Sequence, residues 1–230
     1  MWTTWLGAAI AIALWDWFAV ALSRRRMGYF TKPAVIVALL GAVLAASASL
    51  GSPTPLLSWV VVALVFSLAG DVFLMLPRER FTWGLGAFLL AHVAYLIAFN
   101  LTAPAFTAWT AGLAIGVGML AGKFYERLIT ALNASGKGFL KKPVAAYTLA
   151  ISLMVLSALM LPFRTDIPRS GALAVAVGAV LFFASDGVLA WNRFVRPIPH
   201  GRLFTRILYH VGQIAIVLGV IVIVGAPLPS

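Results

Sequence analysis

Long apolar stretches separated by short polar segments make up almost the whole chain. A transmembrane helix needs about 20 predominantly apolar residues to cross about 30 Å of hydrocarbon. Stretches of that length fall at residues 4–22, 32–50, 56–76, 83–100, 104–122, 143–162, 170–192 and 204–225. The runs are continuous rather than alternating, which favours helices over a membrane barrel. The pattern therefore predicts eight transmembrane helices, with the segment Tyr125–Lys141 as a polar surface connector.

Composition agrees with an integral membrane protein. Of the 230 residues, 63% are hydrophobic and 10% are charged, against about 45–50% and about 25% in soluble domains. We expect one transmembrane helical domain over residues 1–230. No cysteine is present, which excludes disulfides, thiol nucleophiles and thiolate metal sites. The first apolar run has no basic residues before it and is interrupted at Asp16, so we expect a retained helix rather than a signal peptide.

The positive charges predict the orientation in the membrane. Fifteen of the 17 Lys and Arg residues follow the first, third, fifth or seventh helix. They are Arg24, Arg25, Arg26, Lys32, Arg78, Arg80, Lys123, Arg127, Lys137, Lys141, Lys142, Arg193, Arg196, Arg202 and Arg206. By the positive-inside rule both termini face away from the cytoplasm. The net charge of +11 therefore indicates topology and contact with anionic lipid rather than nucleic acid, and we expect a multi-pass protein of a bacterial inner membrane.

Two carboxylates interrupt the apolar helices. Asp71 lies near the end of the third helix, and Asp186 occupies a similar position in the seventh. An aspartate within a membrane helix costs about 2.5–3.5 kcal/mol on insertion scales, so each indicates a functional site. We expect no Lys or Arg within the helical cores to pair with them.

Each aspartate belongs to an ordered set of polar residues that occurs twice. The sets are Lys32-Pro33, Asp71 and His92, then Lys142-Pro143, Asp186 and His210. The spacings from Pro to Asp are 38 and 43 residues, and those from Asp to His are 21 and 24. This predicts a parallel repeat of four plus four helices, with halves of about 1–122 and 123–230 and a pseudo-twofold axis along the membrane normal. Such an axis would bring both aspartates to one central cavity.

Other polar residues near the aspartates have two interpretations each. Lys32 can extend to lipid headgroups or bind a substrate phosphate. His92 and His210 can hydrogen-bond to a neighbouring helix or belong to the site. Tyr95 and Tyr209 are hydrogen-bond partners of that site or interfacial aromatics.

Three further residues have open roles of the same kind. Asn192 and Arg193 close the seventh helix, where Arg193 either holds a phosphate headgroup or marks the cytoplasmic edge. Asp16 pairs with an arginine or lines the cavity.

The ordered motifs resemble those of the YhhN family of membrane proteins, whose animal members are lysoplasmalogenases. The resemblance covers roughly residues 29–225. It rests on Lys-Pro33, Phe-Ser-Leu-Ala-Gly-Asp71, Gly-Ala-Phe-Leu-Leu-Ala-His92-Val-Ala-Tyr95, Lys-Pro143, Phe-Phe-Ala-Ser-Asp186, Asn192-Arg193-Phe194 and Tyr209-His210. It implies hydrolysis of the vinyl ether of a lysoplasmalogen to a fatty aldehyde and a glycerophospho-alcohol. It also implies that Asp71 and Asp186 form the catalytic pair.

The chemistry of a vinyl ether fits two carboxyl groups. Proton delivery to the alkene carbon gives an oxocarbenium-like cation, and water then adds to it. One protonated and one ionised carboxyl can divide this work, as in glycosidases, and no cofactor is required. We expect the lipid tail among Phe66, Phe73, Phe88, Phe182 and Phe183, with the phosphate at Arg193 or Lys32.

Two other functions remain open from the sequence. His92, His210 and the aspartates could instead form a zinc site in a lipid hydrolase. A proton-coupled transporter also combines intramembrane carboxylates with internal repeats, although both aspartates lie near one face rather than at the midplane. The oligomeric state, the headgroup preference and the division of roles between the aspartates are not determined by the sequence.

Overall fold

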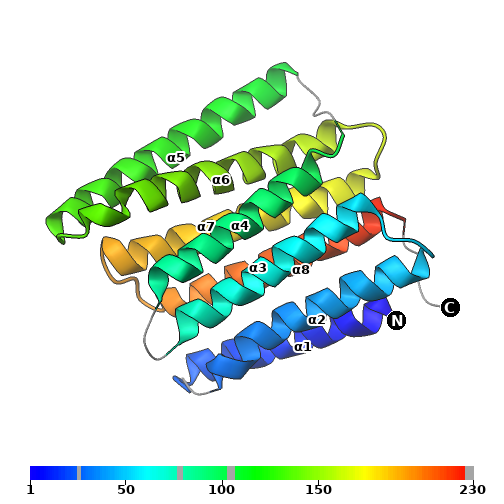
Figure 1. The fold of residues 1–230 in the computed structure, drawn as a ribbon, viewed down its shortest axis with the longest axis horizontal. Coiled ribbons are helices and arrows are strands. Elements are labelled where there is room, and N and C mark those ends of the chain that lie inside the picture. The colour runs from blue at the N-terminus through cyan, green and yellow to red at the C-terminus, as the bar shows by residue number, and fades with distance from the viewer. Residues whose placement is uncertain (25–26, 77–79, 103–106, 226–230) are drawn as a thin grey trace.

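The described part of the chain forms a bundle of eight long helices (Figure 1). The computed structural model describes residues 1–24, 27–76, 80–102 and 107–225; Arg25, Arg26 and Arg78 lie outside the described residues. The elements are α1 (Trp2–Ala21), α2 (Gly28–Ser49), α3 (Pro55–Met75), α4 (Phe81–Phe99), α5 (Ala108–Ala134), η1 (Gly138–Leu140), α6 (Lys141–Met160), η2 (Leu161–Phe163), α7 (Arg169–Phe194) and α8 (Gly201–Ile223).

The predicted helices are found, and seven of them are long and apolar enough to cross a membrane within the described residues. The exception is α5, whose predicted end was also wrong. It is not among the candidate spans, and it runs to Ala134 instead of ending near residue 122. Most of the expected polar connector is therefore helical. Leu128 and Leu132, one turn apart, are buried against Leu140 and Val144, which gives this segment an apolar face on which to fold.

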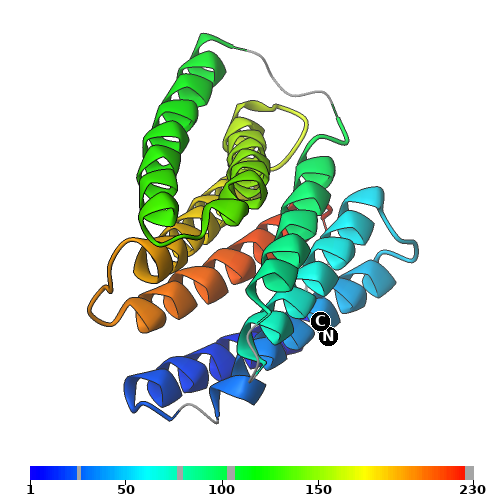
Figure 2. The ribbon, with the colours of Figure 1, turned by 60° about the vertical axis from the view of Figure 1, so that its left-hand side comes forward.

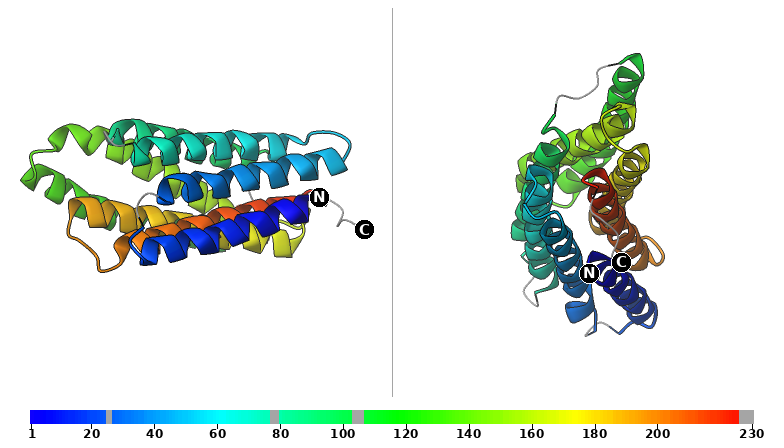
Figure 3. Two further views of the ribbon diagram at one scale, coloured as in Figure 1. Left: turned by 90° about the horizontal axis from the view of Figure 1, so that it is seen from below. Right: turned by 90° about the vertical axis from the view of Figure 1, so that its right-hand side faces the viewer.

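Successive helices run up and down, so that alternate loops meet at the same end of the bundle (Figures 1 and 3). The start of α1 and the end of α8 lie together at one end. The other end, called the basic end below, holds the ends of α1, α3, α5 and α7 and the starts of α2, α4, α6 and α8. Twelve described Lys and Arg residues lie in this half: Arg24, Lys32, Arg80, Lys123, Arg127, Lys137, Lys141, Lys142, Arg193, Arg196, Arg202 and Arg206.

Helices α7 and α8 approach each other closely because glycines face each other at two levels. A Cβ atom on Gly178 would meet the carbonyl oxygen of Gly212 at 2.6 Å, and one on Gly219 would meet that of Gly171 at 2.6 Å. Small residues allow helix backbones in a membrane protein to come this close. This contact sets the position of Asp186 on α7 relative to Tyr209 and His210 on α8.

Helix α5 lies at the edge of the bundle, beside α6 and α7 (Figure 2). Most of its side chains are exposed, and those it buries are Thr110, Ala121, Leu128 and Leu132. The main apolar core lies among the other seven helices. The space between α5 and its neighbours contains the cavity that reaches Asp186.

Candidate active site

An apolar cavity of about 150 Å³ lies between helices α3 to α7 in the basic half of the bundle. Asp186 is the single acidic residue among the described side chains that line it. Its wall is formed by Leu74, Phe81, Leu85, Phe88, Leu120, Ala121, Phe124, Leu128, Val144, Tyr147, Thr148, Ile151, Phe183, Ala184, Asp186, Gly187, Leu189, Ala190 and Phe194. A carboxylate in a predominantly apolar cavity makes this place the candidate active site.

Two side chains hold the Asp186 carboxylate from neighbouring helices. The hydroxyl of Tyr147, on α6, donates a hydrogen bond to Oδ2. Nε2 of His92, on α4, lies 3.3 Å from the same oxygen and 2.9 Å from the Tyr147 hydroxyl. Because the tyrosine donates its one proton to Asp186, His92 donates from Nε2 within this arrangement. The side chain of Asp186 is 14% exposed, whereas that of His92 is fully buried.

An arginine lies at the basic end of the same cavity. The guanidinium carbon of Arg193 lies 4.2 Å from the ring centroid of Phe81 and 5.6 Å from that of Phe194, and both rings line the cavity. Arg193 follows Asp186 by seven residues, which is two helical turns or about 10 Å along the same face of α7. The arginine thus lies about two turns beyond the carboxylate, packed on two rings of the cavity wall.

Asp71 lies in a separate buried cluster formed by α2, α3 and α8. Lys32 Nζ lies 2.5 Å from Asp71 Oδ1, and the Tyr209 hydroxyl donates to Oδ2 at 3.0 Å. The lysine ammonium also lies 4.9 Å from the centroid of the Tyr209 ring. The expectation that no basic residue would pair with this aspartate was therefore wrong. Lys32 lies within helix α2, one turn inside its start, and its side chain reaches Asp71 rather than the headgroup region.

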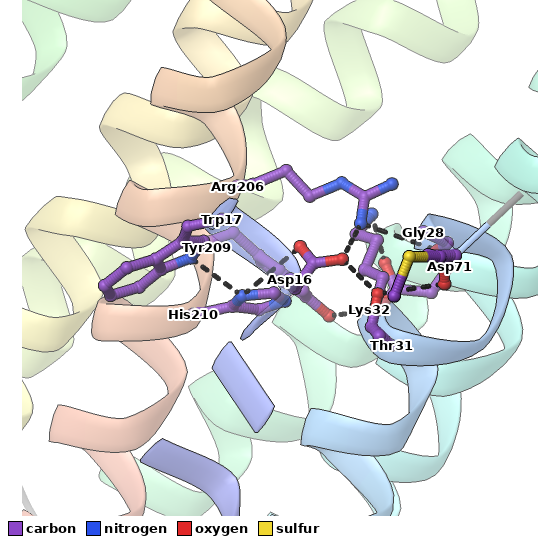
Figure 4. A network of polar contacts seen from close by, with 10 residues as sticks. Asp16, Trp17, Gly28, Thr31, Lys32, Asp71, Arg206, Tyr209 and His210 are labelled. Carbon is purple, nitrogen blue, oxygen red and sulfur yellow. Dashed lines mark hydrogen bonds and ion pairs between the residues drawn. The ribbon is translucent and has the colours of Figure 1, made fainter. Parts of the chain in front are cut away.

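Asp16 forms a third cluster, beside the Asp71 cluster at the basic end (Figure 4). Arg206 Nη1 lies 2.5 Å from Asp16 Oδ1, and the Thr31 hydroxyl donates to the same oxygen. This ion pair joins α1 to α8 and answers the open question about Asp16 in favour of an arginine partner. The Trp17 indole donates to His210 Nδ1 at 3.1 Å, which makes Nδ1 the acceptor nitrogen of that ring.

The two predicted catalytic carboxylates lie in different clusters rather than in one cavity. Asp71 is fully buried and is not among the residues that line the cavity at Asp186. The ring of Phe182 contacts both clusters, with centroids 5.2 Å from that of Tyr209 and 4.8 Å from that of His92. The predicted repeat of four plus four helices stays a prediction. Each aspartate does, however, contact a helix of the other half: Asp71 contacts α8, and Asp186 contacts α4.

The remaining predicted site residues lie away from the cavity. The Tyr95 hydroxyl donates to Gln213 at 2.6 Å, and the Gln213 amide donates to Ser67 at 3.1 Å, which links α4, α8 and α3. The Asn192 side chain accepts a hydrogen bond of 2.8 Å from the backbone of Ile198 and so shapes the loop between α7 and α8.

The expected lipid-contacting rings are divided in the same way. Of the five predicted phenylalanines, Phe88 and Phe183 line the cavity. The others lie outside its wall: Phe66, Phe73 and Phe182.

The predicted zinc ligands are not brought together. His92 lies beside Asp186, whereas His210 lies near Asp16, with Nδ1 4.0 Å from Oδ2. Across the described chain, no group of three or more His, Asp or Glu side chains is arranged to hold a metal ion.

Tyr147 is the site residue that sequence reasoning missed. It lies one turn after Pro143 in a largely apolar helix, and this position was the available signal. The first set of the proposed repeat has Val37 at the equivalent distance from Pro33, so the repeat gave no indication of a tyrosine.

Comparison with known proteins identifies similar sequences. The sequence profile of the YhhN family matches residues 27–220. This chain is 36% identical to lysoplasmalogenase TMEM86B of Sus scrofa over 158 residues. That alignment covers 69% of this chain and 61% of the relative. The chain is 35% identical over 139 residues to a lysoplasmalogenase of Mycobacterium bovis, with 60% of this chain and 50% of the relative aligned. Lysoplasmalogenase TMEM86A of Homo sapiens is 30% identical over 164 residues, with 70% of this chain and 65% of the relative aligned.

The matched region spans about half to two thirds of the length of these curated relatives. No solved structure matches this chain significantly.

Proposed function

The chain belongs to the YhhN family, and on this premise we propose that it is a membrane lysoplasmalogenase. It would hydrolyse the vinyl ether of a lysoplasmalogen to a fatty aldehyde and a glycerophospho-alcohol. Similarity to proteins named lysoplasmalogenase supports the substrate class. The structural observation that carries the proposal is Asp186, a hydrogen-bonded carboxylate in the wall of an apolar cavity that an arginine borders.

Asp186 is proposed as the group that exchanges the proton. In its protonated form it gives a proton to the alkene carbon next to the one that bears the ether oxygen. The resulting carboxylate stabilises the oxocarbenium-like cation, and it accepts a proton from the water that adds to that cation. The hemiacetal then collapses to aldehyde and alcohol, so that one water molecule is consumed and Asp186 regains its proton.

Tyr147 and His92 position the Asp186 side chain for this step. Both contact Oδ2, so the other oxygen, Oδ1, is assigned to the substrate. Oδ1 accepts one long hydrogen bond of 3.4 Å from the Ser185 hydroxyl. A catalytic group gains rate when neighbours fix its geometry before the substrate arrives.

Arg193 is proposed to bind the phosphate of the headgroup. Its guanidinium is held over two aromatic rings of the cavity and can offer two parallel donors to phosphate oxygens. The distance of about two helical turns between Asp186 and Arg193 leaves room for the glycerol, which connects the vinyl ether oxygen to the phosphate.

Asp71 is proposed to support the site from the neighbouring cluster. Its partners are Lys32 and Tyr209, and the Phe182 ring lies against both Tyr209 and His92. This makes Asp71 a positioning residue, whereas the resemblance implied that Asp71 and Asp186 form a catalytic pair at one reaction centre.

The basic end is proposed to face the cytoplasm, with the protein in a bacterial inner membrane. The described charges at that end support this orientation through the positive-inside rule. The headgroup would then lie at the cytoplasmic interface, with the alkenyl chain directed toward the centre of the bilayer.

A panel of lysolipids tests the function. Purified protein is incubated with lysoplasmalogens and with matched alkyl-ether and acyl lysolipids, and the products are identified by mass spectrometry. We expect a fatty aldehyde from the vinyl ethers alone. Release of fatty acid from the acyl lipids would contradict the proposal, as would the absence of any product.

A further inference from the structure

A second apolar space continues from the cavity at Asp186 along helix α5. This groove of about 550 Å³ lies between α5, α6 and α7, and two residues line both spaces: Leu120 on α5 and Phe183 on α7. From there the groove extends away from the basic end as far as Trp109 and Phe163. The two spaces thus adjoin at these residues, and together they extend from the carboxylate toward the opposite end of α5.

The lining of the groove suits a hydrocarbon chain. None of its eleven lining residues is charged, and the indole of Trp109 carries the one polar side-chain group among them. Along α6, Tyr147 at the carboxylate and Leu159 in the groove are twelve residues apart, or about 18 Å. One leaflet of a bilayer is about 15 Å thick in its hydrocarbon part. The two spaces together are therefore as long as the fatty chain of one membrane lipid.

Two glycines on α5 leave the groove open. Gly112 and Gly116 are one turn apart on the face that lines it. A Cβ atom added at either position would meet no atom within 4 Å, so a side chain there can begin without displacing a neighbour. Glycine lowers helix stability by about 1 kcal/mol relative to alanine, and no turn or close helix contact requires it at these positions.

We propose that this groove holds the alkenyl chain of the substrate and that Gly112 and Gly116 set the length of chain that fits. This inference rests on the proposed function. The proposed positions of the headgroup at Arg193 and of the vinyl ether at Asp186 determine where the chain starts, and the adjoining apolar groove gives it a place to extend. Gly116 is nearer the carboxylate than Gly112, so a side chain at 116 shortens the available path by about 6 Å more than one at 112.

Chain-length kinetics test the proposal. Gly112→Phe and Gly116→Phe are compared with Gly118→Phe, a matched control on the same helix whose glycine is exposed, has no atom near its added Cβ and lines neither space. For Gly116→Phe we expect kcat/KM to fall about tenfold or more with octadecenyl lysoplasmalogen and to change less than about twofold with the dodecenyl form. Gly112→Phe should show a smaller loss of the same kind, and Gly118→Phe none. Equal loss with both chain lengths, or the same loss in the control, overturns the inference.

A binding measurement separates this inference from the proposed function. Equilibrium binding of alkyl-ether lysolipids, which have no vinyl ether to hydrolyse, is measured with the same variants and the same two chain lengths. Selective loss of long-chain binding in Gly116→Phe supports the groove even if the protein cleaves no vinyl ether. Unchanged long-chain binding in that variant overturns the groove even if hydrolysis is observed.

Discussion

Lys32 Nζ lies 2.5 Å from Asp71 Oδ1, and the side chains of the two residues are 12% and 0% exposed. This ion pair connects α2 to α3, and the Tyr209 hydroxyl adds α8 to the same cluster. The Asp16 cluster lies beside it, because the two clusters share helices α2 and α8. Thr31 is the residue before Lys32 on α2, and Arg206 lies one turn before Tyr209 on α8. Two neighbouring ion pairs thus join four helices at the basic end (Figure 4).

Breaking the Lys32–Asp71 pair is expected to destabilise the protein. Lys32→Met leaves a buried carboxylate without its basic partner, which costs about 3–5 kcal/mol. The double variant Lys32→Met/Asp71→Leu removes both charges and should recover most of that loss. Thermal unfolding in detergent measures both effects. Additive losses in the double variant would show that the two groups are not coupled.

Tyr147 is expected to affect turnover more than binding. Tyr147→Phe keeps the ring in the cavity wall but removes the hydrogen bond to the Asp186 carboxylate. A hydrogen bond to a charged group is worth about 1.5–3 kcal/mol, so we expect kcat to fall about ten- to hundredfold with little change in KM. Tyr29→Phe, at an exposed tyrosine at the start of α2, is the control. A change confined to KM would contradict a positioning role for Tyr147.

Arg193 is expected to recognise the headgroup phosphate. Arg193→Ala should raise KM for a lysoplasmalogen about tenfold, a change of about 1.4 kcal/mol. The same variant should leave KM nearly unchanged for a monoalkenyl glycerol, which has no phosphate. Arg196→Ala, in the following loop, serves as the control. Equal effects on the two substrates would indicate that Arg193 acts through packing on Phe81 and Phe194.

The glycine contact between α7 and α8 is expected to tolerate no side chain. Gly178→Ala places a Cβ atom 2.6 Å from the carbonyl oxygen of Gly212, so the helices must separate. Overpacking of this kind costs about 1–3 kcal/mol. Gly118→Ala, where the added atom meets nothing within 4 Å, should raise stability slightly. Unfolding midpoints that rank the two variants in the reverse order would contradict this packing.

The sequence predicted the helices well because membrane spans depend on local hydrophobicity. It failed at α5, where Lys123, Glu126 and Arg127 lower the hydropathy of the segment without interrupting the helix. Charged residues end a predicted membrane span, but they do not end the helix, because Leu128 and Leu132 continue to pack against Leu140 and Val144.

The site could be predicted only in part, because partners depend on tertiary packing. Sequence spacing singled out Asp186 and His92 as members of different sets, and the structure places them 3.3 Å apart. It could not show that Lys32 turns inward to Asp71, because the same lysine at a helix start commonly extends to headgroups. Nor could it assign Tyr147, since a tyrosine near the end of a membrane helix is ordinarily an interfacial aromatic.

Aldehyde release by Asp186→Asn tests the central claim most directly. The variant keeps the shape of the side chain but has no carboxyl proton to deliver; loss of a general acid typically costs about 10²–10⁴ in rate. In D2O, the unchanged protein should release fatty aldehyde with one deuterium on the carbon next to the carbonyl. Asp186→Asn should still bind a non-hydrolysable alkyl-ether lysolipid but release at most about 1% as much aldehyde. Near-normal release by Asp186→Asn, with the same deuterium label, would contradict the assignment of Asp186 as the proton donor.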